Sequence, residues 1–487
     1  MAGGDSVLNG LEESWLWEDK PREECGVFGV FGPGMDVAQL SCFGLYALQH
    51  RGQESAGIAV SDGKEIHLHK NMGLVAEVFD EDSLKAMPGN IAIGHVRYST
   101  TGSSSLINAQ PLVFHYLRGM VALAHNGNLT NAAELKQNLA MSGSVFQSTS
   151  DSEIIINLIA RYGQSTIEEA VMKCMIDLKG AYSLVIMTED KLLAVRDPYG
   201  IRPLCLGRMG EAYVVASESC ALDTIGALFL RDVSPGEIVI IDKNGLTSIK
   251  TMAAAHRALC FFEFVYLARP DSTIDGETVT KVRQEMGRQL ARECQLEADM
   301  VVPVPDSGTA AAMGYAKESG IPFTEGLMKN RYIGRTFIQP SQKMRDLGVR
   351  LKLNPIRQVL KGQRVVLVDD SIVRGTTSKK IVALMRDAGV KEVHLLIASP
   401  PVRHPCYYGI DTSARAELIA AQHEPADITR FIGADSLHYL SLAGMLGSVA
   451  QDQANFCVAC FSGRYPVEVP RKVLEAKFFL EKGDSCD

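Results

Sequence analysis

Cys25 is the first residue whose surroundings predict covalent chemistry. It stands between an acidic stretch, residues 1–24, and the glycine-punctuated run GVFGVFG. If the chain were cut between Glu24 and Cys25, one residue would carry both a thiol nucleophile and an α-amino base with a pKa of about 7.7–8.0. No histidine partner would then be required. Taken alone, Cys25 fits a buried thiol at the start of a strand equally well.

The other groups needed to hydrolyse an amide come from three further segments. In AHNGN, the side-chain amide of Asn126 and the unhindered N–H of Gly127 could bind the oxyanion of a tetrahedral intermediate. Arg97, in GHVRYSTTG, could hold a carboxylate, and Asp151, in STSDSE, could pair with an ammonium, so that together they would recognise a free amino acid. Two plainer interpretations stay open: Asn-Gly is typical of a turn, and Asp151 is a good N-cap for the helix that follows.

Five motifs resemble the class II glutamine amidotransferase domain in their order and spacing: CGVFG, LQHRGQESAGI, GHVRYSTTG, HNGNLTN and TSDSE. That family has the N-terminal nucleophile hydrolase fold. The resemblance implies that removal of residues 1–24 exposes Cys25 as the nucleophile and that Asn126 and Gly127 form the oxyanion hole. It also implies a glutamine pocket lined by Arg51 and Gly52, with Arg97 on the α-carboxylate and Asp151 on the α-amino group of glutamine.

A second candidate site lies in RVVLVDDSIVRGTTS, residues 364–378, where two carboxylates separate a β-branched strand from a small-residue loop. The loop Ser371–Thr377 could point backbone N–H groups and hydroxyls at a phosphate, and the dipole of the following helix would favour the anion. Asp369 and Asp370 could accept from ribose hydroxyls or face a divalent ion. The alternative interpretation is a plain strand-to-helix turn.

This run resembles the signature of type I phosphoribosyltransferases, which bind 5-phosphoribosyl 1-pyrophosphate with Mg²⁺. The resemblance implies that Ser307, in VPVPDSGT, joins Asp369 and Asp370 at the metal and the diphosphate. The basic stretch at 329–352 would be a flap that closes over the diphosphate and excludes water; otherwise it is a solvated basic loop. The other residues implied in phosphoribosyl pyrophosphate binding are Ser371, Arg374, Gly375, Thr376, Thr377, Lys329 and Arg335.

A glutaminase half followed by a phosphoribosyl half resembles the amidophosphoribosyltransferase family, and FFEFVYLARPDS at 261–272 strengthens the resemblance. The implied reaction converts glutamine, phosphoribosyl pyrophosphate and water into 5-phosphoribosylamine, glutamate and diphosphate, the first committed step of purine synthesis. Ammonia would have to travel between the pockets away from bulk water, with Tyr266 as a candidate channel wall, because protonation destroys its nucleophilicity.

Two rival functions are weaker. An amidotransferase that makes an amino sugar would need a sugar-phosphate isomerase domain in place of VDDSIVRGTT. A regulatory sensor of phosphoribosyl pyrophosphate would have no reason to keep Cys25, Asn126, Gly127 and Asp151 together.

Cysteines suggest a third site. The C-x-x-C pair Cys457 and Cys460 could serve a metal, but this spacing also fits zinc or redox chemistry. The resemblance to the iron–sulfur subgroup of the family adds Cys260 and Cys406 and implies a structural [4Fe–4S] cluster on four thiolates.

Composition limits what the whole chain does. The 487 residues carry a formal net charge of −8, which disfavours nucleic acid as a partner, and no apolar run approaches the roughly 20 residues that span a membrane. The start of the chain resembles neither a secretory signal nor a transit peptide, and eleven scattered cysteines fit a reducing compartment, so we expect a cytoplasmic protein. The family resemblance further implies a homotetramer inhibited by purine nucleotides such as AMP and GMP.

The elements that must position these residues fall into two patterns. Short strand-like runs separated by glycine, with helices at Ser152–Tyr162 and Thr166–Leu178, continue to about residue 255 and predict an α+β layered domain. Helix and strand then alternate, which predicts βαβ crossovers. We therefore expect a layered αββα N-terminal nucleophile hydrolase domain followed by an α/β type I phosphoribosyltransferase domain with a mostly parallel sheet. The predicted boundaries are a leader at 1–24, an amidotransferase domain at 25–259, a phosphoribosyltransferase domain with a C-terminal Fe–S segment at 260–470, and a tail at 471–487.

Overall fold

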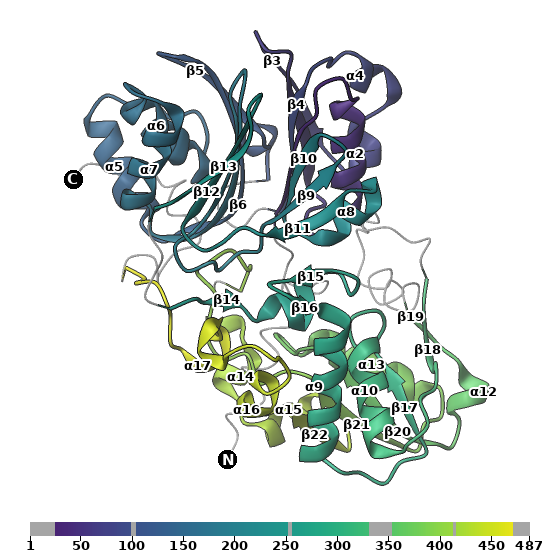
Figure 1. Ribbon diagram of the computed structural model, residues 1–487. Helices are drawn as coiled ribbons and strands as arrows, with labels where there is room; N and C mark the ends of the chain where they lie inside the picture. The colour runs from purple at the N-terminus through teal and green to yellow at the C-terminus, as the bar shows by residue number, and fades with distance from the viewer. Residues whose placement is uncertain (1–24, 99–103, 252–255, 331–352, 413–414, 471–487) are drawn as a thin grey trace.

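The structure is a computed structural model that describes residues 25–98, 104–251, 256–330, 353–412 and 415–470. The predicted leader and tail lie outside the described residues. Two halves follow each other along the chain, and in Figure 1 the first lies above the second.

The first half contains two antiparallel sheets. The seven-stranded sheet has the order β11-β9-β10-β1-β4-β2-β3 and the six-stranded sheet the order β13-β12-β8-β7-β6-β5. The strands of the first sheet are β1 (Gly26–Phe31), β2 (Ser55–Ser61), β3 (Ile66–Met72), β4 (Ile91–Arg97), β9 (Cys205–Met209), β10 (Ala212–Ala216) and β11 (Leu228–Asp232). Those of the second are β5 (Leu112–Tyr116), β6 (Gly119–Leu129), β7 (Gly180–Met187), β8 (Leu192–Arg196), β12 (Glu237–Asp242) and β13 (Gly245–Lys250).

Helices cover the outer face of each sheet (Figure 1). On the seven-stranded sheet these are α2 (Val37–Ala47), α3 (Val75–Val78), α4 (Glu81–Lys85) and α8 (Ser219–Ile225). On the six-stranded sheet they are α5 (Ala132–Met141), α6 (Ser152–Tyr162) and α7 (Ile167–Asp177), while a 3₁₀ turn, η1 (Leu106–Asn108), precedes β5. The helix predicted at Ser152–Tyr162 therefore has the bounds of α6, and the αββα fold class is confirmed.

Strand β1 shows why the sequence folds this way. Phe28 and Val30 pack under α2, whereas Val27 and Phe31 pack between the two sheets, so all six residues of GVFGVF are buried. Alternate side chains of a strand point to opposite faces, and a strand covered on both faces must be apolar throughout.

The second half is built on a four-stranded sheet, β17 (Met300–Pro303), β20 (Arg364–Asp369), β21 (Glu392–Ile397) and β22 (Ser436–Tyr439), whose pairings are all parallel. Its longer helices are α9 (Val279–Glu293), α10 (Thr309–Ser319), α13 (Thr376–Asp387) and α15 (Pro425–Ile432). The shorter elements are β18 (Leu327–Lys329), β19 (Leu353–Pro355), α12 (Arg357–Leu360), η3 (Arg415–Glu417), α14 (Ile419–Gln422), α16 (Leu442–Leu446), η4 (Gln453–Asn455) and α17 (Ala459–Ser462). The predicted parallel sheet with helical crossovers is confirmed.

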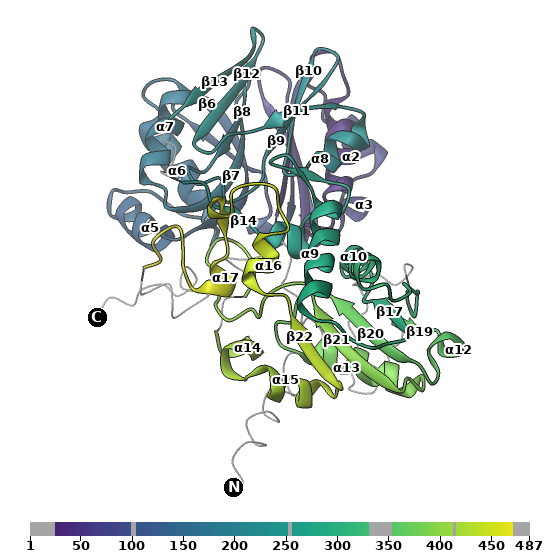
Figure 2. The same cartoon turned by 60° about the horizontal axis from the view of Figure 1, so that its bottom comes forward.

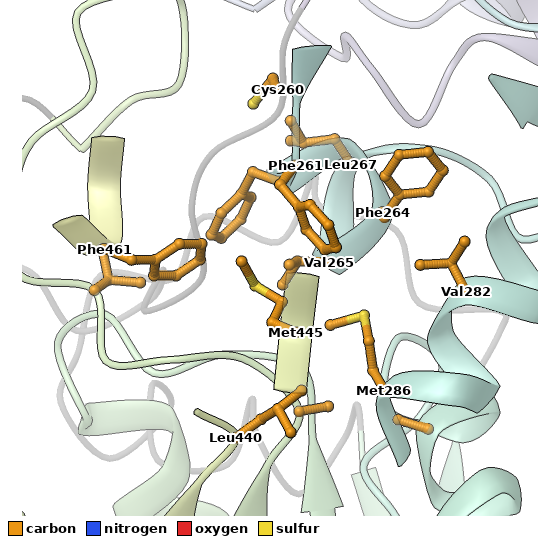
Figure 3. Packing of buried hydrophobic residues seen from close by; sticks show 14 of the residues in the cluster. Cys260, Phe261, Phe264, Val265, Leu267, Val282, Met286, Leu440, Met445 and Phe461 are labelled. Carbon is orange, nitrogen blue, oxygen red and sulfur yellow. The ribbon is translucent and has the colours of Figure 1, made fainter. Parts of the chain in front are cut away.

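The halves meet at a junction built from residues just after the first domain. It comprises β14 (Leu259–Cys260), a π-helical turn η2 (Glu263–Leu267), β15 (Thr273–Ile274) and β16 (Glu277–Thr278). β14 pairs in parallel with β23 (Phe456–Cys457), so the C-terminal segment returns to the junction, as Figure 2 shows. Figure 3 shows the apolar cluster there, in which Phe264 and Val265 of η2 lie beside Val282 and Met286 of α9.

Candidate active sites

Cys25 lies immediately before β1, and its thiol donates to the carbonyl oxygen of Tyr98 at 3.4 Å. Burial raises the pKa of this thiol to about 11; the Tyr98 contact and Arg97 act in the opposite direction, while Glu54 and Asp151 raise the pKa further. Arg97 and Asp151 are therefore near enough to Cys25 to influence the charge on its thiol. At neutral pH the thiol is protonated, so a nucleophilic Cys25 needs a base beside it.

Asn126 and Gly127 lie within β6, paired with Ser183 and Tyr182 of β7, and not in a hairpin turn. The turn interpretation of Asn-Gly is therefore wrong. The Asn126 side chain is fully buried, and neither its Oδ1 nor its Nδ2 has a hydrogen-bond partner among the described residues. Gly127 has φ +143°, and a Cβ there would lie 2.0 Å from the Ala181 carbonyl oxygen, so no other residue fits. A buried amide without a partner is costly in a native protein unless it serves a ligand.

Arg97 ends β4 and is almost fully buried, with Nη1 3.9 Å from Glu54 Oε2. Asp151 stands at the N-cap position of α6 but makes no capping hydrogen bond. Its Oδ2 instead accepts from the backbone N–H of Leu129 at 3.0 Å, and its Oδ1 lies 3.7 Å from Nδ1 of His125. Asp151 thus occupies the predicted N-cap position, but its side chain accepts from the end of β6 and does not cap α6.

Arg51 was predicted to line the glutamine pocket with Gly52. The structure places its guanidinium at the junction, where it pairs with Glu218 and with Glu263 at 2.6 Å. Its role toward glutamine stays a prediction. Gly52 lies against the end of β4, since a Cβ there would be 2.6 Å from the backbone nitrogen of Arg97.

The second site lies at the carboxyl end of β20, where parallel-sheet domains bind ligands. Asp369 and Asp370 are each 2% exposed. Ser307 Oγ donates to Asp370 Oδ1 at 2.5 Å and Ser371 Oγ to Asp370 Oδ2 at 2.6 Å, so the predicted serine and carboxylates do meet.

The loop after Asp370 leads into α13. Gly375 precedes this helix with φ +79°, a conformation that favours glycine, and Thr376 and Thr377 are its first residues. Arg374 pairs with Glu417, and Lys329 pairs with Asp306 at 2.6 Å. Arg335 and the rest of the predicted flap, 331–352, lie outside the described residues.

The structure brings the four cysteines of the predicted cluster, which come from separate segments of the sequence, near one another in pairs. Cys260 and Cys457 are register partners in the β14–β23 pair. Burial raises the pKa of Cys457 to about 12 and that of Cys460 well above its usual value, and neighbouring Cys406 raises both further. Within the described residues, no three His, Cys, Asp or Glu side chains are close enough to bind one metal ion.

Sequence reasoning missed three carboxylates beside these sites: Glu218 and Glu263, which are buried, and Glu54, which is partly exposed. A signal for Glu263 was available: a lone glutamate inside the apolar run FFEFVYL must find a buried partner.

Comparison with known proteins agrees with this architecture. Residues 95–224 match the family described as "Glutamine amidotransferase domain" and residues 277–407 the family described as "Phosphoribosyl transferase domain". Amidophosphoribosyltransferase from Mycobacterium tuberculosis (strain ATCC 25618 / H37Rv) is 52% identical over 475 residues, covering 95% of this chain and 90% of the relative. The chain belongs to the amidophosphoribosyltransferase family. The relative from Bacillus subtilis (strain 168) is 51% identical over 453 residues, covering 92% of this chain and 95% of that protein.

Among amidophosphoribosyltransferases of known structure, the glutamine phosphoribosylpyrophosphate amidotransferase from B. subtilis complexed with ADP and GMP is 50% identical. Its TM-score is 0.87, and the match covers 92% of this chain and 98% of that one. This chain is thus a pentosyltransferase with a glutamine amidotransferase domain: it moves nitrogen from glutamine to phosphoribosyl pyrophosphate in the first committed step of purine biosynthesis. In the part of the chain that the structure describes, no helix has the length and apolar character to cross a membrane.

Proposed function

We propose that the glutaminase reaction takes place at Cys25 after removal of residues 1–24. The freed α-amino group takes the thiol proton, and the sulfur attacks the side-chain carbonyl of glutamine. Ammonia leaves, and water then hydrolyses the γ-glutamyl thioester to glutamate. The raised pKa of Cys25 supports this need for a local base.

The single observation that carries the proposal is the buried, unpartnered amide of Asn126 next to Gly127. An oxyanion accepting from Asn126 Nδ2 and the Gly127 N–H would supply the missing partner and stabilise the tetrahedral intermediate. Arg97 would bind the α-carboxylate, and Asp151, beside the same thiol, the α-amino group of the substrate.

The phosphoribosyl half would use the loop 371–377 for the phosphate and the paired aspartates for the ribose and the metal. Ser307, Asp369 and Asp370 offer hard oxygen donors, and their mutual contacts support a site for Mg²⁺, which usually takes one or two carboxylates together with substrate phosphates. Bound Mg²⁺ would neutralise charge on the diphosphate leaving group. Arg374, Lys329 and Arg335 would add positive charge there.

The four thiols Cys260, Cys406, Cys457 and Cys460 would hold a structural [4Fe–4S] cluster. A four-iron cluster spreads its ligands more widely than a single ion does, and the return of Cys457 to Cys260 supports this choice. Anaerobically prepared protein should then be brown and contain iron and sulfide. Stoichiometric zinc instead would overturn the assignment.

The family context supports four further proposals. The relative complexed with ADP and GMP favours inhibition by purine nucleotides. We also expect a homotetramer located in the cytoplasm. Ammonia would pass along the junction, where Tyr266 packs against the apolar cluster.

The deciding experiment follows glutamate release in the presence and absence of phosphoribosyl pyrophosphate. Cys25→Ala should lose all turnover with glutamine and keep turnover with free ammonia, because the second site is separate. Glutamine-dependent activity in Cys25→Ala would refute the assignment.

A further inference from the structure

Four buried charged side chains form a cluster at the junction of the two halves, behind the proposed glutamine pocket. They are Arg51, Arg202, Glu218 and Glu263, each no more than 1% exposed. Arg51 Nη2 donates to Glu263 Oε2 at 2.6 Å, and Arg202 Nη1 lies 3.6 Å from Glu263 Oε1. Burying an ion is unfavourable unless partners compensate it, and here every member has an opposite charge beside it.

The Arg51 end of this junction cluster is tied to the proposed substrate carboxylate site. Gly52 follows Arg51 directly and packs on the end of β4, where a Cβ would lie 2.6 Å from both Arg97 N and Val96 C. Two residues later, the N–H of Glu54 donates to the Arg97 carbonyl oxygen at 3.1 Å. A shift of the Arg51 backbone would therefore move Arg97.

The Glu263 end is fixed to the second half. Glu263 is the first residue of η2, whose neighbours Phe264 and Val265 lie in the apolar cluster shown in Figure 3. Arg283 of α9 donates to the carbonyl oxygens of Phe264 at 2.7 Å and Ala268 at 2.9 Å, which anchors both ends of the turn. Glu263 thus stands on a rigid element and presents its carboxylate to a loop of the other half.

We propose that Glu263 is a positioning residue for glutamine: through Arg51 it fixes the Arg51–Gly52 backbone against β4 and so holds the Arg97 guanidinium where the substrate carboxylate must lie. This inference rests on the proposed role of Arg97. Glu218 holds the other edge of the Arg51 guanidinium and also accepts from Ser272 Oγ at 2.5 Å. Glu263 itself belongs to the phosphoribosyl half and acts without touching glutamine.

The test is Glu263→Gln, which keeps the side-chain size and removes the charge. The KM for glutamine should rise about tenfold or more, because charge-assisted hydrogen bonds are the stronger kind, while the rate with saturating ammonia stays within about twofold. Arg51→Gln, which also removes the contact with Glu218, should give at least the same rise, and adding Glu263→Gln to it should raise the KM no further, because the Arg51–Glu263 contact is already absent. If Glu263→Gln does not accumulate as folded protein, Arg51→Lys serves instead, since an ammonium cannot bridge two carboxylates in the same way.

The matched control is Glu237→Gln. Glu237 is also 1% exposed and pairs with Arg231 at 2.8 Å, but it lies at the start of β12 and not at the junction, so its loss should leave the KM for glutamine unchanged. An unchanged KM in the Glu263 variant, additive effects in the double variant, or equal loss of glutamine- and ammonia-dependent rates would each overturn the proposal. If the proposed glutamine site itself were wrong, Cys25→Ala would still use glutamine. That result is separate from the outcomes of the Glu263 variants.

Discussion

Replacing Asn126 with leucine tests whether its amide is present for catalysis or for stability. The side chain is 0% exposed and both of its polar atoms lack a partner among the described residues. Leucine has nearly the same size and no hydrogen-bonding group. Since an unsatisfied buried polar group costs about 1–3 kcal/mol, the free energy of unfolding of Asn126→Leu should be unchanged or higher by about that amount. Turnover with glutamine should fall about 10²–10³-fold, the usual loss on removing one oxyanion donor.

Asn131→Leu is the matched control. Asn131 is 5% exposed, and its amide is satisfied: Nδ2 donates to the Asp177 carbonyl oxygen at 2.8 Å, and Oδ1 accepts from the Lys179 N–H at 3.1 Å. Its replacement leaves two backbone groups unpaired and should lower the free energy of unfolding by about 1–3 kcal/mol with glutamine turnover retained.

Both variants are measured by denaturant unfolding and by separate glutamine- and ammonia-dependent assays. The expected result is a crossed pattern: Asn126→Leu loses activity and not stability, and Asn131→Leu loses stability and not activity. If Asn126→Leu were destabilised as much as the control while still hydrolysing glutamine normally, the oxyanion-hole argument would be refuted.

Three further predictions follow from the same geometry. Because the pKa of the Cys25 thiol is about 11, glutamine hydrolysis should rise with pH through the titration of a freed amine near 7.7–8.0 and then level off; a rise that continued to about 11 would exclude the amine as base. Asp370→Asn should lose about 100-fold or more with glutamine and with ammonia alike, and selective loss with glutamine would contradict its placement at the ribosyl site. Burial lowers the pKa of His95 to about 3, below the unfolded value of about 6.5. The contribution of neutral His95 to stability is therefore complete above about pH 6.5 and is lost as the pH falls toward about 3. The melting temperature of His95→Gln should accordingly change less than that of the unmodified protein between about pH 6.5 and 4.

Much of the architecture could be predicted because it depends on local periodicity. The uniformly apolar run at Gly26–Phe31 indicates a strand covered on both faces, and the amphipathic pattern of Ser152–Tyr162 gives a helix with those bounds. The strand Arg364–Asp369 and the following helix at Thr376 follow in the same way from a β-branched run and a glycine.

The contacts of individual side chains could not be predicted, since their partners are far away in the sequence. The sequence predicted that Asp151 caps a helix, but its carboxylate accepts a hydrogen bond from the backbone N–H of Leu129, 22 residues earlier. Arg51 was predicted to line the glutamine pocket, which stays a prediction, and nothing in the sequence indicated that it also pairs with glutamates 167 and 212 residues later. Ion pairs between residues so far apart produce no periodic pattern in the sequence. Only the folded chain therefore shows which charged side chains meet.

The junction also brings the segment that carries Cys406 into contact with the strand of the proposed oxyanion hole. Asn128, two residues after the proposed oxyanion donor, donates through Nδ2 to the carbonyl oxygen of Tyr407 at 2.9 Å. Gly409 lies over Gly127, since a Cβ at Gly409 would be 3.5 Å from the Gly127 Cα. The segment that carries Cys406 therefore rests on the end of β6. If Cys406 holds the proposed cluster, loss of that cluster should therefore also disturb the strand that would bind the oxyanion, although the two sites share no residue.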